Sequence, residues 1–176
     1  IEKSPIFTSE LKIEDFSFQK DTVGTISINV NNEKLATYNA KIGIIGNGNK
    51  VDLDGNYYLN NNGLDFTLNI EKLNMKSIQG FTFGNLTEST GFLNGNYIIS
   101  GTTEKPKIIG TLKFNEVGFK VKTLNAKFKS MNDKIDFSEN KIVFNNFIIK
   151  DEKDNNLSIN GSLDSQNFSN LGFNLK

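Results

Sequence analysis

The sequence predicts an all-β protein of about a dozen strands with one short helix. Apolar and polar residues alternate with a period of two along most of the chain, which is typical of a sheet with one dry face. Turn signals rich in Asn and Gly separate these stretches at intervals typical of hairpins. The composition agrees, because the chain has 15 Phe but only 2 Pro, and Pro removes a donor from the hydrogen-bond ladder.

The N-terminal part of the chain contains three alternating stretches. Residues 11–18 alternate with a one-residue slip at Glu14-Asp15, which predicts a bulge or bend at that point. Residues 26–30 are expected to form a regular strand, and residues 38–44 supply the next apolar row. The Gly46-Asn-Gly-Asn49 stretch then predicts a tight hairpin turn, because Asn-Gly tolerates the positive φ that such turns need.

The centre of the chain interrupts this pattern once. Residues 51–55 and 64–70 predict another hairpin around an Asn-rich turn. In residues 73–81, however, apolar residues recur near helical spacing. Asn74 precedes them as a good N-cap, so we expect one or two short helical turns there.

The stretch from Gly91 to Phe114 predicts two strands joined at residues 102–107. Pro106 lacks a backbone donor and therefore suits the turn or the start of the second strand. The remaining predicted strands lie at residues 117–121, 124–128, 135–137, 142–144, 147–149, 157–161 and 171–175.

The composition narrows the functional classes. The chain contains no Cys, His or Trp, and its 20 basic residues, all Lys, balance 20 acidic ones. Without a group that titrates near neutrality or a thiolate, we expect no enzyme, no catalytic residue, no metal site and no cofactor. Without a basic excess or Arg, we expect no nucleic-acid partner. The sequence contains no apolar run of about 20 residues, so it predicts no transmembrane helix.

Two parts of the sequence are similar to each other. The segment that begins at Pro5 parallels the one that begins at Pro106, and residues 51–55 parallel residues 157–161. We therefore expect two related units at about residues 2–70 and 103–176, joined by residues 71–102. Units of this kind stack in elongated arrays, so residues 1–176 are predicted to be a single continuous segment of a longer protein.

Several short motifs occur in a characteristic order. They are Leu73-Asn-Met-Lys-Ser-Ile, Gly91-x-Leu-x-Gly95, Ile99-x-Gly101-Thr, Pro106-x-Ile-x-Gly110-x-Leu112, Leu124-Asn and Phe147-x-Ile-x-Asp151. In this order the chain resembles the C-terminal region of the TamB family (translocation and assembly module, AsmA-like superfamily). The resemblance implies an elongated antiparallel sheet folded lengthwise into an open trough, or β-taco, with an apolar interior. It also implies the periplasm of a two-membrane bacterium, with the full-length protein anchored in the inner membrane.

The resemblance further implies a bridge that conducts phospholipid between the inner and outer membranes and supports outer-membrane biogenesis. Phospholipid or another acyl-chain lipid is the expected partner, together with outer-membrane assembly proteins. Two alternatives stay open. The chain could act as a chaperone-like module that pairs with strands of outer-membrane β-barrel proteins. It could also be a structural β-repeat of a surface protein, which predicts a closed sandwich.

An apolar groove would be lined by one residue from every second strand position. The predicted lining residues are Ile26, Ile28, Val30, Tyr38, Ile42, Ile44, Val51, Leu53, Leu64, Phe66, Leu68, Leu93, Tyr97, Ile99, Ile108, Leu112, Phe114, Phe119, Phe128, Phe137, Phe144, Phe147, Ile149, Leu157 and Ile159. A closed β core without a ligand is the alternative interpretation of the same alternation.

Overall fold

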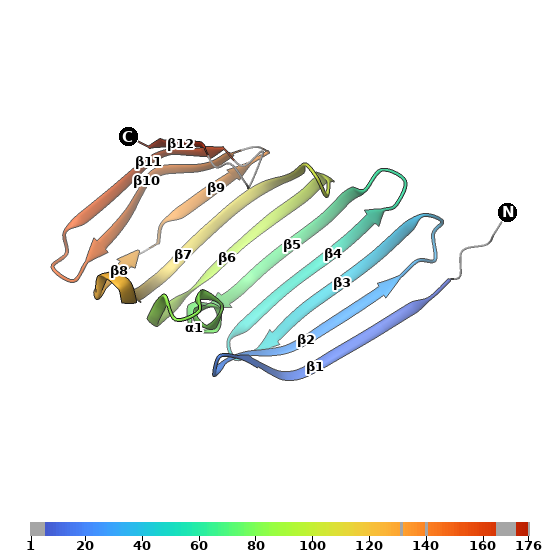
Figure 1. Cartoon of the computed structure of the whole chain (residues 1–176), viewed down its shortest axis with the longest axis horizontal. Coiled ribbons are helices and arrows are strands. Elements are labelled where there is room, and N and C mark those ends of the chain that lie inside the picture. Colours follow the sequence, from blue (N-terminus) through green and yellow to red (C-terminus); the bar gives the residue numbers. More distant parts are fainter. Residues whose placement is uncertain (1–5, 131, 140, 165–171, 176) are drawn as a thin grey trace.

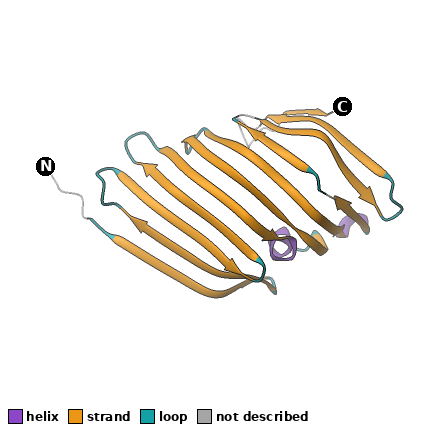
Figure 2. Ribbon diagram, turned by 180° about the vertical axis from the view of Figure 1, so that it is seen from behind, coloured by secondary structure: helices purple, strands orange, loops and turns teal. Residues whose placement is uncertain are grey.

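The described chain forms one large antiparallel sheet with a short helix at one end. The computed structural model describes residues 6–130, 132–139, 141–164 and 172–175. The strand order is β1-β2-β3-β4-β5-β6-β7-β8-β10-β11-β12, and β9 pairs with both β7 and β10. Figure 1 shows the strands side by side from β1 to β12, and Figure 2 shows the same sheet from behind. The predicted all-β class with one short helix is confirmed.

Most strands are long, and short turns connect them. Their bounds are β1 Thr8–Phe18, β2 Asp21–Asn31, β3 Thr37–Gly46, β4 Asn49–Tyr58, β5 Gly63–Asn74, α1 Met75–Gln79, β6 Leu86–Thr102, β7 Pro106–Val121, β8 Ala126–Ser130, β9 Lys134–Ser138, β10 Lys141–Asp151, β11 Asn156–Asp164 and β12 Gly172–Leu175. Two 3₁₀ turns, η1 Gly80–Thr82 and η2 Lys122–Leu124, complete the described elements. All twelve strands belong to a single sheet, so the closed sandwich expected for a surface-protein repeat is not what the described residues form.

The predicted turns have the expected backbone geometry. Asn47 and Gly48 connect β3 to β4 with φ angles of 48° and 77°, as a two-residue hairpin with two left-handed positions requires. Pro106 begins β7 and pairs with Gly101 at the end of β6. Both predictions for these turns are confirmed.

Four strands contain the same kind of β-bulge. In each, one polar residue has a positive φ, and the pairing register shifts beside it. An extra residue would move the following side chains to the other face unless the backbone turned, and the left-handed residue supplies that turn. The bulge residues are Asp15 in β1, Glu88 in β6, Glu116 in β7 and Asn146 in β10. The bend predicted at Glu14-Asp15 is confirmed.

Helix α1 is attached to the sheet by a buried polar network. The Asn74 side chain accepts a hydrogen bond from the Lys76 backbone N–H and caps the helix, as predicted. Asn49, only 3% exposed, donates to the Val23 carbonyl at 2.6 Å and to Ser77 Oγ at 2.9 Å. The Asn49 Oδ1 also accepts from the Asn74 backbone N–H at 2.7 Å. The helix therefore lies fixed at one end of the strands (Figures 1 and 2).

The hydrophobic core is small for a chain of this size. Among the described residues the buried hydrophobic side chains are Val23, Met75, Tyr97, Val117 and Phe147. The solvent-accessible surface is 11360 Å², whereas a compact monomer of 19.7 kDa would expose about 8,600 Å². The excess arises because a single sheet leaves both of its faces without a second layer.

The two-unit organisation stays a prediction. Residues 2–5, 131, 140 and 171, on which part of the sequence correspondence rests, lie outside the described residues. The bulges at Asp15 and Glu116 occupy equivalent places in the two segments that the sequence comparison aligned.

Candidate functional site

The cross-strand register places the predicted lining residues on one face of the sheet. Partners in an antiparallel pair point to the same side, so each pairing extends the face by one strand. One row runs from β1 to β11 through Leu11, Ile28, Ile42, Leu53, Leu68, Tyr97, Gly110, Phe137, Ile142 and Leu163. A neighbouring row contains Ile13, Ile26, Ile44, Val51, Ile70, Gly95, Leu112 and Ile135. We call the side on which these rows and the predicted lining residues lie the apolar face.

Aromatic contacts connect the strands on this face. Phe114 of β7 lies 5.0 Å from Phe147 of β10 between ring centroids, although the two strands are not paired there. Tyr97 and Phe137 meet edge to face at 5.5 Å, and burial raises the pKa of the Tyr97 hydroxyl to about 12. Edge-to-face geometry is favourable for aromatic pairs, so these rings hold the face in one arrangement.

Glycines opposite aromatic residues allow the rings to lie against the sheet. A Cβ added at Gly110 would lie 2.5 Å from Cδ1 of Tyr97, and one added at Gly55 would lie 2.7 Å from Cδ1 of Phe66. Both glycines are the register partners of these aromatic residues. The rings therefore cover backbone that a side chain would otherwise occupy.

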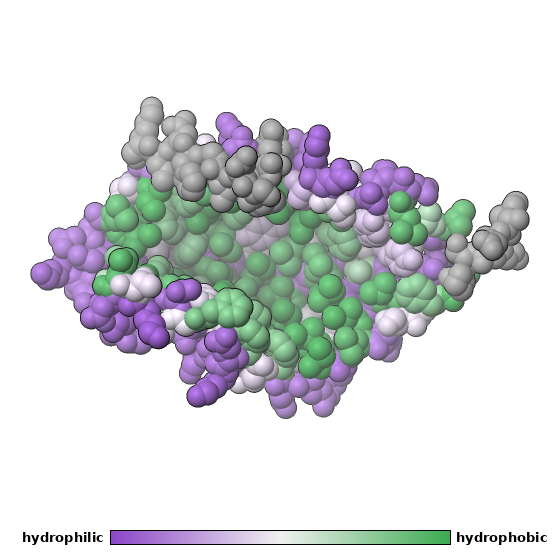
Figure 3. All heavy atoms as spheres, in the orientation of Figure 1, coloured by the Kyte–Doolittle hydropathy of each residue, from purple (hydrophilic) through white to green (hydrophobic). Residues whose placement is uncertain are grey.

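The apolar face is only partly covered. Tyr97 and Phe147 are buried, but most other predicted lining residues are half-buried, and Leu157 is 57% exposed. Figure 3 shows hydrophobic side chains gathered across this face, with a hollow in its middle and hydrophilic side chains along its border. Such an extended exposed apolar surface marks an interaction site in a water-soluble setting.

The opposite face is mainly polar. Lys41 and Asp54, cross-strand partners on β3 and β4, form an exposed ion pair at 3.4 Å. Next to them, Asp52 pairs with Gly43 and Asn69. Within the described ranges, no group of three or more acidic side chains could hold a metal ion. We call this side the outer face.

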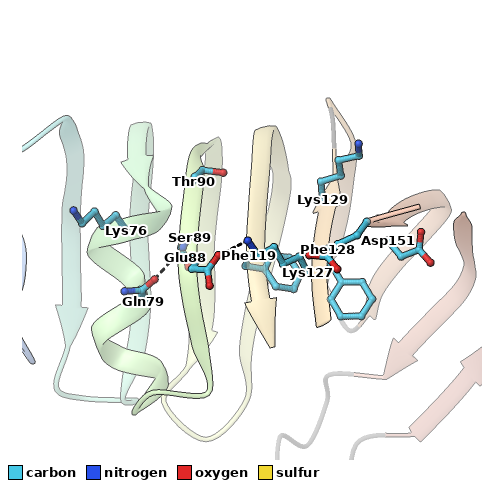
Figure 4. A pocket seen from close by; sticks show the side chains of 11 residues that line it. Lys76, Gln79, Glu88, Ser89, Thr90, Phe119, Lys127, Phe128, Lys129 and Asp151 are labelled. Atoms are coloured by element: carbon cyan, nitrogen blue, oxygen red, sulfur yellow. Dashed lines mark hydrogen bonds and ion pairs between the residues drawn. The ribbon is translucent and has the colours of Figure 1, made fainter. Parts of the chain in front are cut away.

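A cavity of about 750 Å³ lies where helix α1 approaches the strands β6 to β8. Figure 4 shows Lys76 and Gln79 on α1 at one side, Ser89 on β6, and Lys129 and Asp151 at the other side. Gln79 Oε1 accepts a hydrogen bond from the Ser89 backbone N–H at 3.0 Å. Phe119 and Phe128, which are paired on neighbouring strands, also line the cavity. The cavity is therefore continuous with the apolar face.

Most charged groups around this cavity are paired. Lys127 forms an ion pair with Glu88 at 2.5 Å, and its hydrogen bond lowers the pKa of the Glu88 carboxyl. Lys129 pairs with Asp154 at 2.7 Å. The Asp151 carboxylate accepts hydrogen bonds from the side chain and backbone of Asn155, which lower its pKa.

Sequence reasoning missed part of the face and the whole cavity. Ile70, Ile142 and Leu163 share the face, but their place follows from register, which alternation alone does not define. The cavity joins side chains from α1, β6 and β8 that are far apart in sequence. No sequence motif indicates it, since Lys76 and Glu88 look like ordinary surface charges.

Comparison with known proteins identifies a family. The model of the TamB C-terminal domain matches residues 36–176. The comparisons with curated proteins and with solved structures gave no match. No helix in the described part of the chain is long and apolar enough to cross a membrane.

Proposed function

Because the chain belongs to the TamB family, we propose that its apolar face conducts phospholipid acyl chains between the inner and outer membranes. The family match supports a role in outer-membrane assembly, in the envelope of a Gram-negative bacterium. The observation that carries the lipid proposal is the continuous, half-exposed apolar face, which runs across neighbouring strands from β1 to β11.

The energetics favour an acyl chain as the occupant. Each methylene exposed to water costs about 0.8 kcal/mol, so an apolar surface lowers the barrier to moving a lipid through an aqueous space. Neighbouring strands are about 4.8 Å apart, which makes the row from Leu11 to Leu163 about 40 Å long. One leaflet of a bilayer is about 15 Å of hydrocarbon, so the row exceeds one acyl chain in length.

Sliding is part of the proposal. Apolar side chains interact with methylenes through non-directional contacts, so one position along the row holds a chain about as well as the next. In the intact protein, the sheet would fold lengthwise into an open trough in the periplasm, anchored at the inner membrane. The described chain would then be one continuous section of that trough. It would act without catalysis or a cofactor.

Photocrosslinking tests this proposal. A photoreactive residue at Phe66 or Phe114 should crosslink to acyl chains of co-purified phospholipid, because both side chains lie on the apolar face. Matched controls are Thr67 and Lys113, their neighbours in sequence on the outer face, which should give little lipid adduct. Equal labelling of both faces, or no lipid at any of the four positions, would contradict the proposal.

A second function is favoured by the edge of the sheet. Among the described residues, β1 pairs only with β2, so its other edge has unpaired backbone groups. Leu11 and Ile13 on this strand are 51% and 37% exposed. Such an edge can add a strand from another protein, such as an unfolded β-barrel protein. Crosslinks from Lys12 to outer-membrane proteins, unaffected by Phe66→Asp, would favour this function over lipid transport.

A further inference from the structure

The cavity beside helix α1 contains two unpaired charges of opposite sign. The Lys76 ammonium on α1 forms no ion pair or side-chain hydrogen bond with any described residue. Glu152, in the turn after β10, likewise forms no ion pair in the described chain; its charge reaches Lys127 only at longer range. Since Lys127 is bound to Glu88, both remaining charges are available to a ligand.

The lining of the same cavity includes a buried hydroxyl without a partner. Ser89 is 8% exposed, and its Oγ is the buried side-chain N or O atom of the described chain that has no hydrogen-bond partner. A buried polar group left unsatisfied costs about 1–3 kcal/mol. Ser89 lines the cavity, so rotation about its Cα–Cβ bond can turn the inaccessible Oγ towards a ligand there, which then supplies the missing hydrogen bond.

The apolar part of the cavity has a defined exit. Phe119 and Phe128, with ring centroids 6.1 Å apart, belong both to the cavity and to the apolar face. An amphiphile bound in the cavity can therefore place its hydrocarbon on the apolar face while its polar end stays between α1 and the end of β10. The volume of about 750 Å³ is within the usual range for small-molecule sites.

We propose that this cavity binds the headgroup of a zwitterionic phospholipid, with its phosphate at Lys76 and Ser89 and its primary ammonium at Glu152. Since Lys127 is paired with Glu88 and Lys129 with Asp154, the lining groups without an ion pair are Lys76 and the carboxylates of Asp151 and Glu152, so a ligand that carries both a negative and a positive group can meet both signs. A purely anionic headgroup would instead meet the unpaired Glu152 carboxylate. The proposal rests on the lipid-conducting function proposed above and names the class of lipid.

Lipid binding to the purified chain tests the proposal. Phosphatidylethanolamine and phosphatidylglycerol of the same acyl composition are supplied separately, and the bound lipid is quantified by native mass spectrometry. Lys76→Gln should weaken binding of both lipids by about tenfold, since it removes a charge-assisted hydrogen bond to phosphate. Glu152→Gln should weaken only phosphatidylethanolamine and so abolish the preference between the two lipids. Ser89→Ala should weaken both lipids by a smaller factor.

The controls separate this site from general surface charge. Lys105 and Glu104 lie in the exposed turn between β6 and β7, at the other end of these strands. The variants Lys105→Gln and Glu104→Gln should therefore bind both lipids as the wild type does. Glycerophosphoethanolamine, which has no acyl chain, should compete with the lipid, whereas inorganic phosphate should compete much less. If inorganic phosphate competes equally, the cavity is a simple anion site and the proposal is wrong.

The outcome also distinguishes the two proposals. An unchanged lipid preference in Glu152→Gln, with lipid crosslinks still present at Phe66, would overturn the headgroup site and leave the conduction of acyl chains intact. If a photoreactive residue at position 66 gives no lipid crosslinks in a protein whose cavity residues are unchanged, the conduction proposal itself is wrong. In the double variant Lys76→Glu with Glu152→Lys, restored preference for phosphatidylethanolamine would show that the pair of opposite charges, not overall net charge, selects the lipid.

Discussion

Replacing two leucines in the middle of the apolar face should remove lipid without unfolding the protein. Leu53 and Leu68 are cross-strand partners on β4 and β5, and both are half-buried. We consider the double variant Leu53→Asn with Leu68→Asn. Full burial of a Leu side chain stabilises a protein by about 1.5–3 kcal/mol, so half-burial suggests a loss of about 1 kcal/mol for each substitution. A loss of about 2 kcal/mol in total leaves a typical domain folded.

The double substitution should weaken lipid binding by more free energy than it removes from folding stability. With a strand spacing of about 4.8 Å and about 1.3 Å per methylene from ordinary bond lengths, an acyl chain places about 7 methylenes over two strands. An open face covers roughly one side of each methylene, which corresponds to about 0.4 kcal/mol each. The two polar side chains thus remove up to about 3 kcal/mol, or about a hundredfold in affinity.

The assay measures phospholipid per protein after purification, together with the unfolding midpoint in urea. The matched control is Asp54→Asn with Thr67→Asn, cross-strand partners on the same two strands but on the outer face. This control should keep its lipid. Equal lipid in the leucine variant and the wild type, or an equal loss in the control, would refute the assignment of lipid to the apolar face.

Three further predictions concern the groups that shape this face. Burial raises the pKa of Tyr97 to about 12, above its ordinary value of about 10. The unfolded chain therefore ionises first, and stability should fall as pH rises from about 10 to 12; Tyr97→Phe should lack this loss in unfolding measurements at pH 9 and 11.5, and an identical loss would contradict it. Gly110→Ala should lower the free energy of unfolding by about 1–3 kcal/mol, because its Cβ would lie 2.5 Å from the Tyr97 ring; an unchanged urea midpoint would show that the strands adjust freely. Asn49→Ala leaves the Val23 carbonyl and the Asn74 N–H without partners, so about 3 kcal/mol should be lost and the amides of α1 should exchange faster with solvent; unchanged exchange would mean that α1 is held by other contacts.

Local signals in the sequence were sufficient to predict most strands. They did not show that β7 runs through residue 116 or that β10 runs through residue 146, and Leu124, predicted to begin a strand, lies in η2. Alternation, the Asn47-Gly48 turn, Pro106 and the Asn74 cap each act within a few residues, and the structure confirms all four. The slip at Asp15 was also visible, because a bulge changes the phase of alternation within one strand.

Local sequence signals did not predict the contacts between residues that are far apart in the chain. Whether the apolar residues faced a second layer depends on how many strands join one sheet, and alternation is the same in a closed core and an open face. The cavity depends on α1 reaching β6, where Gln79 receives the Ser89 N–H, and on β8 lying beside β7. Its ionic groups carry no spacing signal, so Lys76 and Glu152 could be recognised only from the folded chain.

The bulges explain how one apolar face continues across irregular strands. In a strict period of two, Phe16, Val117 and Phe147 would point to the outer face, because each lies three residues after a side chain of the apolar face. The left-handed residue between them restores the phase, at a cost of about 1–3 kcal/mol for a residue that is not Gly. The β6 strand uses the same geometry at Glu88, whose φ is 53°. There the extra residue turns Ser89 into the cavity and leaves Glu88 to bind Lys127, so one backbone feature serves both the continuity of the face and the polar site at its end.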